Sequence, residues 1–376
     1  MRLRLLAASV LLALTLGACG GSGSAPEVGR EILVLGVLGT SESDQPLVAG
    51  MIRGVEQAVA EYNDSPDSRY DIELKQFNTR PQPGEAGAGE SEIANTERLV
   101  GAVGPLALPE VQALAPALEN SGLPYVVPSV TATSVPADGW RGFRRLVAND
   151  RQEGRVLAAH ALERVSGAIA LVTEDSPEGT PFAEGAKEAL EGAQRPPSRT
   201  NTIKPDDPPV TLSTNLTNEA PEAILYGGGG VSGKSLLDNL RKAGYQGLLI
   251  ASHQLRELNP DGLGGGVISS SAAADPAGPA AARFAQRYQD RFDAAPTAFS
   301  LESYEGALML LEAVEEVGGD PRTVTEFLEL NRRFRGDSKT YEFDDQGEPA
   351  NAPLWVYEST NGGWKLSGRS DRLAQQ

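Results

Sequence analysis

The chain has 376 residues, of which 40% are hydrophobic, and this length provides enough apolar material for one large or two smaller α/β cores. Its formal net charge of −18 repels nucleic acid and anionic lipid headgroups, so we expect no nucleic-acid partner. The single cysteine excludes an internal disulfide and a cysteine-based metal site.

Residues 1–18 are predicted to be a signal peptide. Arg2 and Arg4 form a cationic start, and the apolar run over residues 5–16 is too short for a permanent membrane helix. The run ends in Leu-Gly-Ala-Cys19, which resembles the lipobox of bacterial lipoproteins; the alternative is an ordinary signal peptide with an incidental cysteine. We therefore expect an exported chain, anchored to the outer face of the cell membrane by a lipidated Cys19. Residues 19–30 are expected to form a flexible tether, with no later membrane span.

The sequence after the tether has a pattern typical of a parallel α/β sheet. Residues 31–39 (EILVLGVLG) are nearly all apolar, as in a central parallel strand, and apolar spacing over 48–62 predicts a helix with one buried face. Residues 71–77 alternate between apolar and polar, which predicts a strand near a sheet edge. Pro, Gly and acidic residues over 79–91 predict an exposed loop, followed by a helix through Leu99.

Residues 101–133 predict a strand, a helix and a second strand, which together form a parallel βαβ unit. The helix ends at Ser121-Gly122, and the second strand covers residues 123–127. In open parallel sheets, ligands bind outside the carboxyl ends of the strands. The loops 104–108 and 129–133, the second rich in hydroxyl groups, are therefore expected to face a ligand.

The same alternation of strands and helices restarts after residue 147. Predicted strands cover residues 168–173, 200–204, 223–226, 247–251, 266–269, 340–343 and 354–358, and predicted helices cover 150–165, 181–190, 233–243, 279–292, 300–317 and 323–331. Asp150 is the expected N-cap of its helix. Two successive runs of this kind predict an α/β fold with two doubly wound, Rossmann-like lobes.

Two features that could indicate catalysis are weak in this sequence. Residues 228–235 (GGGVSGKS) match the P-loop pattern between a strand and a helix, although that helix N-terminus could also bind a ligand anion. The next strand offers no acidic residue for Mg²⁺, and an exported protein has no ATP supply. His160 and His253 are too few for a histidine-based metal site or a catalytic triad. We expect a protein that is not an enzyme and has no cofactor and no metal.

Several short motifs follow one another in a fixed order along residues 31–363. They are VLGVLG in the first strand, VGP at 103–105, GLPYVVPSVT at 122–131, GFR at 142–144, IALVTED ending at 175, AILYGG from 223, YEGA from 304 and FDDQGE from 343. Their order resembles type I periplasmic solute-binding proteins, especially the branched-chain amino-acid-binding group of ABC transporters. The resemblance implies two lobes joined by three crossings, with the ligand cleft between them. The first lobe would comprise residues 31–148 and 275–348, and the second 149–274 and 349–376.

The resemblance also implies which residues face the ligand. The Ser129 and Thr131 loop matches one whose hydroxyls and backbone N–H groups bind a carboxylate. Four further positions depart from the family: a usual Ser is Leu108, two usual Tyr residues are Glu178 and Gly229, and the acid that meets a ligand ammonium is His253. These departures favour a ligand other than Leu, Ile or Val. Together, Glu174, Asp175, Glu178 and His253 in place of the usual pocket suggest a ligand with a cationic group.

The resemblance implies a lipid-anchored solute-binding protein that delivers a small polar, amino-acid-like molecule to an ABC permease by lobe closure. The alternative is a non-transporting lipoprotein of the same fold, acting as a sensor or interaction module in the cell envelope. The lost pocket positions favour this alternative, whereas the retained Ser129–Thr131 loop argues against it.

Overall fold

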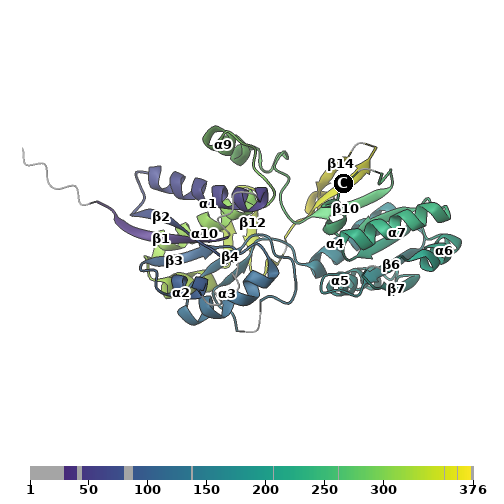
Figure 1. Cartoon of the computed structure of the whole chain (residues 1–376), viewed down its shortest axis with the longest axis horizontal. Helices are drawn as coiled ribbons and strands as arrows, with labels where there is room; N and C mark the ends of the chain where they lie inside the picture. The colour runs from purple at the N-terminus through teal and green to yellow at the C-terminus, as the bar shows by residue number, and fades with distance from the viewer. Residues whose placement is uncertain are drawn as a thin grey trace, which may run out of the picture.

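The computed structural model describes residues 29–39, 45–79, 88–136, 139–205, 207–260, 262–350, 352–361 and 363–373. The predicted signal peptide, Cys19 and most of the predicted tether lie outside these ranges. Within them, no helix is long and apolar enough to cross a membrane. Figure 1 shows two α/β bodies side by side, which we call the first and second lobes.

The first lobe is built on a five-stranded sheet in the order β2-β1-β3-β4-β5, and all its strand pairs are parallel. Its strands are β1 (Glu31–Leu38), β2 (Tyr70–Phe77), β3 (Leu99–Val103), β4 (Tyr125–Val127) and β5 (Phe143–Arg145). The edge position predicted for residues 71–77 is confirmed by β2. β3 is buried along its whole length, as a strand between two helical layers must be.

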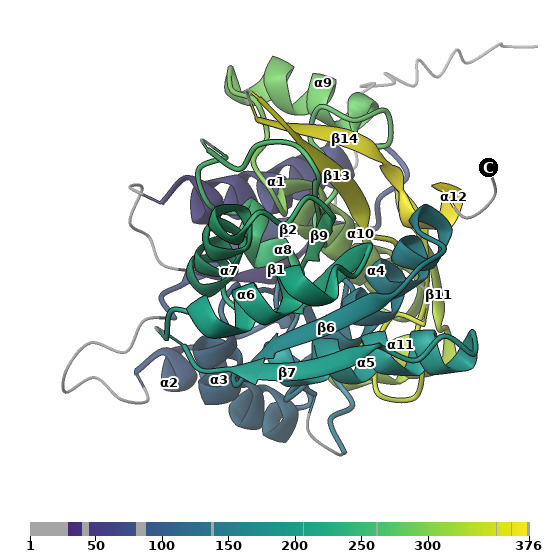
Figure 2. The same ribbon diagram turned by 90° about the vertical axis from the view of Figure 1, so that its right-hand side faces the viewer.

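The second lobe is built on a seven-stranded sheet in the order β14-β13-β10-β9-β8-β6-β7 (Figure 2, viewed from the side of this lobe). Its strands are β6 (Ile169–Glu174), β7 (Arg199–Ile203), β8 (Ala223–Gly227), β9 (Leu248–Ala251), β10 (Val267–Ser271), β13 (Trp355–Thr360) and β14 (Gly363–Arg369). The strands β6 to β10 are parallel, and the C-terminal hairpin β13–β14 adds antiparallel strands beside β10. A separate ribbon pairs β11 (Arg333–Arg335) with β12 (Thr340–Glu342).

Helices cover both faces of each large sheet. In the first lobe they are α1 (Pro46–Asp64), α2 (Ala88–Ala94), α3 (Leu108–Ser121), α9 (Ala282–Phe292), α10 (Ser300–Val317) and α11 (Pro321–Leu330). In the second they are α4 (Asp150–Arg164), α5 (Gly179–Gly192), α6 (Val210–Glu219), α7 (Gly230–Ala243), α8 (His253–Arg256) and α12 (Ser370–Leu373). One apolar cluster joins α1 and α10 to the first sheet, and a second joins α3 to its other face. The second sheet has α7 on one face and α4 with α5 on the other.

Glycine allows α4 and α5 to approach closely. A Cβ on Gly154 would lie 2.0 Å from the Phe182 carbonyl oxygen, and one on Gly185 would lie 1.9 Å from that of Arg151. Each helix therefore presents a glycine to the backbone of the other. This close packing fixes the start of α4, which begins directly at the passage between the lobes.

Three sequence expectations differ from the structure. The helix before β3 ends at Ala94, and Leu99 begins a buried strand instead of ending a helix. Asn149, not Asp150, caps α4, in a capping box with Gln152. The helix α6 was not expected, because its β-branched and hydroxyl residues have low helix propensity; it packs against α7 and buries Leu216 in the apolar cluster of the second lobe.

The chain passes between the lobes three times: between β5 and α4, between β10 and α9, and between β12 and β13. Residues 148–149, 274–275 and 348–349, which lie in these passages, remain our proposed lobe boundaries. Two buried charged side chains of the first lobe hold the first two passages. The Lys339 ammonium donates to the Leu146 carbonyl at 3.1 Å, and the Glu302 carboxylate accepts from the Ala274 N–H at 2.7 Å.

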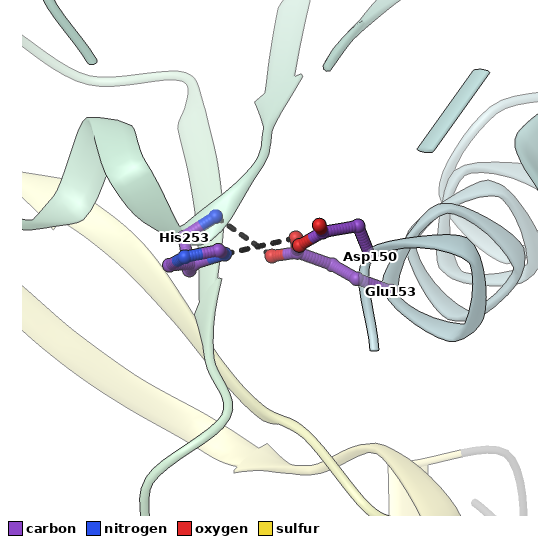
Figure 3. Close-up of side chains that lie close together, drawn as sticks. All are labelled: Asp150, Glu153 and His253. Atoms are coloured by element: carbon purple, nitrogen blue, oxygen red, sulfur yellow. Dashed lines mark hydrogen bonds and ion pairs between the residues drawn. The ribbon is translucent and has the colours of Figure 1, made fainter. Parts of the chain in front are cut away.

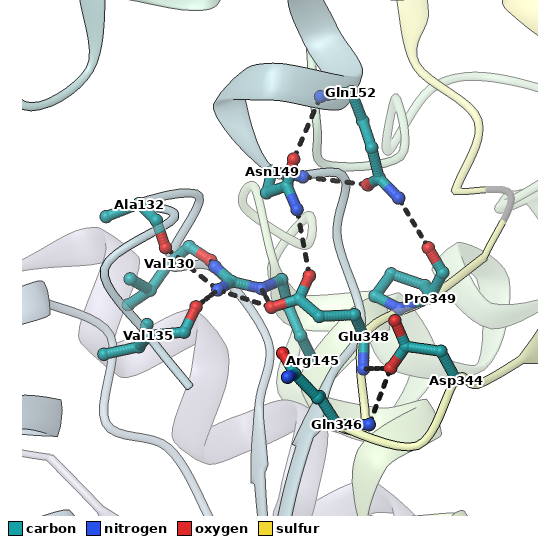
Figure 4. Close-up of polar contacts among 10 residues, drawn as sticks. All are labelled: Val130, Ala132, Val135, Arg145, Asn149, Gln152, Asp344, Gln346, Glu348 and Pro349. Carbon is teal, nitrogen blue, oxygen red and sulfur yellow. Dashed lines mark hydrogen bonds and ion pairs between the residues drawn. The ribbon is translucent and has the colours of Figure 1, made fainter. Parts of the chain in front are cut away.

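The first and third passages are joined through Arg145 (Figure 4). Its fully buried guanidinium contacts Glu348 at 2.9 Å and 2.8 Å. The second oxygen of Glu348 accepts from the Asn149 amide at 3.1 Å, and Gln152 donates to the Pro349 carbonyl at 2.7 Å. The guanidinium also donates to the carbonyls of Val130, Ala132 and Val135, which lie in the loop after β4.

This arrangement predicts that Arg145→Met strongly destabilises the protein. Loss of the guanidinium leaves Glu348 and three loop carbonyls without their buried donor, which costs about 3–5 kcal/mol of unfolding free energy. The control is Arg164→Met, which breaks the exposed pair with Glu358 and should cost about 1 kcal/mol or less. Urea unfolding measures both variants, and equal losses would contradict the special role of Arg145.

Candidate ligand-binding site

The first-lobe candidates lie on the loop after β4 and at the start of α3. The Ser129 hydroxyl donates to the Leu106 carbonyl at 2.9 Å, so its proton already has a partner within the protein. The Thr131 carbonyl accepts from the Asp150 N–H at 3.0 Å, which ties this loop to the first turn of α4. Leu108 begins α3 and packs against the apolar cluster behind the loop. Thr131 is thus the candidate of this lobe that is hydrogen-bonded to the second lobe.

The second-lobe candidates Glu178 and Gly229 follow β6 and β8. Glu178 is half-buried and immediately precedes α5, without capping it through its side chain. Gly229 precedes α7, and its N–H donates to the Glu174 carboxylate at 3.4 Å. The Tyr226 hydroxyl donates to the same carboxylate at 3.3 Å. A carboxylate of the protein thus lies at the N-terminus of α7.

This position of Glu174 bears on the P-loop match at residues 228–235. A P-loop needs free backbone N–H groups and a lysine that reaches phosphate oxygens. Here Glu174 lies where a phosphate would bind, and the Lys234 ammonium pairs with Asp238 on the next turn at 2.7 Å. The match is therefore to the sequence pattern and does not extend to the side-chain arrangement of a phosphate site.

His253, which follows β9, is held by a buried carboxylate from α4 (Figure 3). Glu153 is 2% exposed and accepts from the His253 backbone N–H at 2.7 Å and from its ring Nδ1 at 3.0 Å. The Ser270 hydroxyl on β10 donates to the same carboxylate. Three donors therefore fix Glu153, and Glu153 fixes the imidazole.

Asp150 lies beside this pair and has an unusual environment. It is 1% exposed, and among the described residues neither carboxylate oxygen has a hydrogen-bond partner within 3.5 Å. The Thr131 hydroxyl is near enough to favour its ionised form. Sequence analysis did not select Asp150 or Glu153 as site residues, although their spacing of three places both on one face of α4.

The charges in this cluster perturb one another. Burial, with the charge of Glu153, raises the pKa of Asp150 to about 7 against the opposing effects of His253, Thr131 and Arg145. Burial alone would raise the pKa of Glu153 and lower that of His253. The attraction and hydrogen bond between them reverse both effects: the pKa of Glu153 lies below its usual value, and that of His253 rises to about 9. Near neutral pH the pair is therefore ionised.

Asp150, Glu153 and His253 could also be considered as metal ligands, because one donor atom from each lies within 4.8 Å of the others. Glu153, however, uses its oxygens for His253 and Ser270. A metal ion would have to break the contact between Glu153 and Nδ1 before it could use both side chains. The arrangement fits an oriented histidine better than a metal centre.

The structure brings Thr131 and His253 together through Asp150, and it leaves the other candidates apart. In the described part of the chain, no hydrogen bond or ion pair joins Leu108, Glu178 or Gly229 to this cluster. A pocket of about 350 Å³ lies between α4 and residues that include Ala352, Val356 and Asp371, and its lining includes none of the predicted ligand residues. The cluster at the start of α4 is thus the best-defined candidate site.

Two doubly wound lobes, three connecting passages and polar loops at the strand ends define the architecture of a type I periplasmic binding protein. A sequence profile of the periplasmic binding protein family matches residues 33–363, and the chain belongs to this family. Members of this family are substrate-binding proteins and not enzymes.

The chain is similar to several named solute-binding proteins. It is 25% identical over 254 residues to the leucine-, isoleucine-, valine-, threonine-, and alanine-binding protein of Pseudomonas aeruginosa, an alignment that covers 64% of this chain and 66% of the relative. The Desulfitobacterium hafniense ABC transporter substrate-binding protein in complex with Leu has a TM-score of 0.76 at 17% identity, covering 89% of this chain and all of that one. A solute-binding protein from R. palustris in complex with benzoate has a TM-score of 0.66 at 16% identity, covering 90% of this chain and 96% of that one.

The raised pKa of Asp150 predicts a specific pH dependence of stability. The folded protein keeps this proton up to about pH 7, whereas the unfolded chain loses it near 3.8, so ionisation destabilises the fold as pH rises through this window. Asp150→Asn has no proton to lose. Between about pH 5 and about pH 8 it should gain roughly 3 kcal/mol relative to wild type.

Urea unfolding at both pH values measures this gain. The control is Glu191→Gln, which removes an exposed carboxylate from the neighbouring helix α5, where its partner is Lys187, and should leave the pH profile unchanged. Parallel profiles for wild type and Asp150→Asn would show that Asp150 is already ionised in the folded protein and would contradict the prediction.

Proposed function

We propose that this protein is a lipid-anchored, extracytoplasmic solute-binding protein that delivers a small polar ligand to an ABC importer. The ligand would bind between the lobes and draw them together, and the closed form would dock on the permease. Anchoring through a lipid on Cys19 would keep the protein beside the permease, on the outer face of the cell membrane. The observation that supports this proposal most is the contact of the Thr131 loop with the first turn of α4.

The proposed ligand is of about amino-acid size and carries a carboxylate. The names of the similar proteins support this class, because leucine and benzoate share a carboxylate and differ in the rest of the molecule. On this chain the Thr131 hydroxyl is the first-lobe donor we propose for it, since the Ser129 hydroxyl already donates to Leu106. Leu108, Glu178 and Gly229 would line the remaining walls.

The alternative, a non-transporting sensor or interaction module, is favoured by the departures at Leu108, Glu178, Gly229 and His253. A thermal-shift screen with amino acids, organic acids, peptides and sugars separates the two possibilities. A ligand present at one hundred times its dissociation constant stabilises the fold by about 2.7 kcal/mol. No stabilisation by any member of the screen would favour the interaction module.

Thr131→Ala tests the proposed carboxylate contact. Loss of one charge-assisted hydrogen bond worth about 1.5–3 kcal/mol should weaken binding roughly ten- to a hundredfold. The matched control is Thr133→Ala, which removes an exposed hydroxyl two residues further along the same loop and should leave affinity unchanged. Calorimetric titration with the ligand found in the screen measures both. Equal affinities for wild type and Thr131→Ala would mean that the loop does not bind the ligand.

A further inference from the structure

Arg144, the residue before the hinge residue Arg145, is a buried arginine on the edge strand β5 of the first lobe. Only 5% of its surface is exposed, and its Nη1 group donates to the carbonyls of Arg141 at 3.0 Å and of Phe143 at 2.6 Å. Its Nε is buried without an acceptor, and Nη2 forms no hydrogen bond with the described residues. One edge of a buried guanidinium thus lacks acceptors, which is costly for a charged group.

The carboxylates whose charges act on Arg144 are committed to other donors. Glu329 pairs with Arg141 at 2.7 Å, whereas Glu119 and Asp344 accept from backbone N–H groups at 2.8 Å and 2.9 Å. They attract the guanidinium of Arg144 from a distance, but within the described ranges no carboxylate forms an ion pair with it. The chain therefore leaves this buried cation without a counter-ion in contact.

A cavity of about 80 Å³ lies against Arg144, on the inside of the first lobe. Its apolar walls come from α10, α11, β11 and the residue after β12, and they are Met309, Phe327, Leu328, Phe334 and Phe343. The Phe343 ring centroid lies 6.0 Å from the guanidinium carbon. A single water needs about 10–15 Å³ of such space, so this cavity has room for a molecule of several non-hydrogen atoms. Its lining includes none of the predicted ligand residues.

The polar groups of the lining determine what the cavity can bind. Besides Arg144 they are Asn331, Arg333 and Glu312, all three exposed. A carboxylate fits the Nε and Nη2 edge, because its two oxygens match two parallel N–H groups. The aromatic walls favour an anion that also has an apolar part, which a halide lacks. A second negative charge on the same molecule would meet Glu312, so a monoanion is favoured.

We infer that Arg144 binds the carboxylate of a short-chain monocarboxylic acid, whose alkyl part packs against the phenylalanine rings of this cavity. The acid is a counter-ion within the first lobe, at a site separate from the proposed ligand site between the lobes. It supplies the acceptors that Nε and Nη2 lack, and it therefore stabilises the folded protein.

Urea unfolding of the full chain tests this inference, with sodium butyrate as the probe. The comparison solutions are sodium chloride, disodium succinate, and the neutral isostere butyramide in sodium chloride, all at equal ionic strength. Butyrate is expected to raise the unfolding midpoint until the site is saturated, succinate to do so less, and chloride and butyramide not at all. Equal midpoints in butyrate and chloride would overturn the inference.

Three substitutions assign the effect to its site. Arg144→Met should weaken the apparent affinity for butyrate about tenfold or more, and Arg164→Met, which breaks an exposed ion pair in the second lobe, should not. Thr131→Ala should keep the effect, whereas butyrate bound between the lobes would lose it. If Arg144→Met fails to fold, Arg144→Lys retains the charge without the planar fork and should show the same loss. Full butyrate affinity in the Arg144 variant that folds, or its loss in Thr131→Ala, would overturn the inference.

Discussion

The buried guanidinium of Arg145 is the contact on which the site most depends. It donates to three carbonyls of the loop after β4 and pairs with Glu348 of the third passage, which in turn accepts from Asn149 in the first. The loop that carries Thr131 is therefore held by the same group that joins two of the passages between the lobes. Breaking this pair would disturb the ligand loop and the hinge together, since a buried charge without its partner is costly.

The first turn of α4 links this hinge to the second lobe. Asn149 caps the helix and contacts Glu348, the Asp150 backbone N–H donates to the Thr131 carbonyl, and the Glu153 carboxylate accepts from His253. Within one helical turn, the chain thus contacts the hinge, the first-lobe loop and the second-lobe histidine. Movement of the second lobe about this turn would carry His253 relative to Thr131, and a ligand that contacts both would favour the closed arrangement.

Much of the fold could be predicted from the sequence, because parallel strands and their helices have local apolar patterns. The site was less accessible to sequence analysis. Glu153 and His253 lie 100 residues apart, so no local pattern indicates that they meet. The P-loop match shows the opposite error: residues 228–235 have the right local sequence, but Glu174, from a strand 55 residues earlier than Gly229, lies at the helix N-terminus. Thr131 could be proposed from the sequence because its loop follows a strand whose position the apolar pattern predicts.

The central claim is that a ligand closes the two lobes about this hinge. Leu47 and Val231 are exposed residues at the starts of α1 and α7, the helices that follow β1 and β8, and so lie at the strand ends on opposite lobes. Cys19→Ser removes the one native cysteine. Spin labels at Leu47→Cys and Val231→Cys then report the distance between these two ends by pulsed electron–electron double resonance. The account predicts a shorter and narrower distance distribution when the chain is saturated with a ligand confirmed by calorimetry. An unchanged distribution with that ligand bound would contradict it.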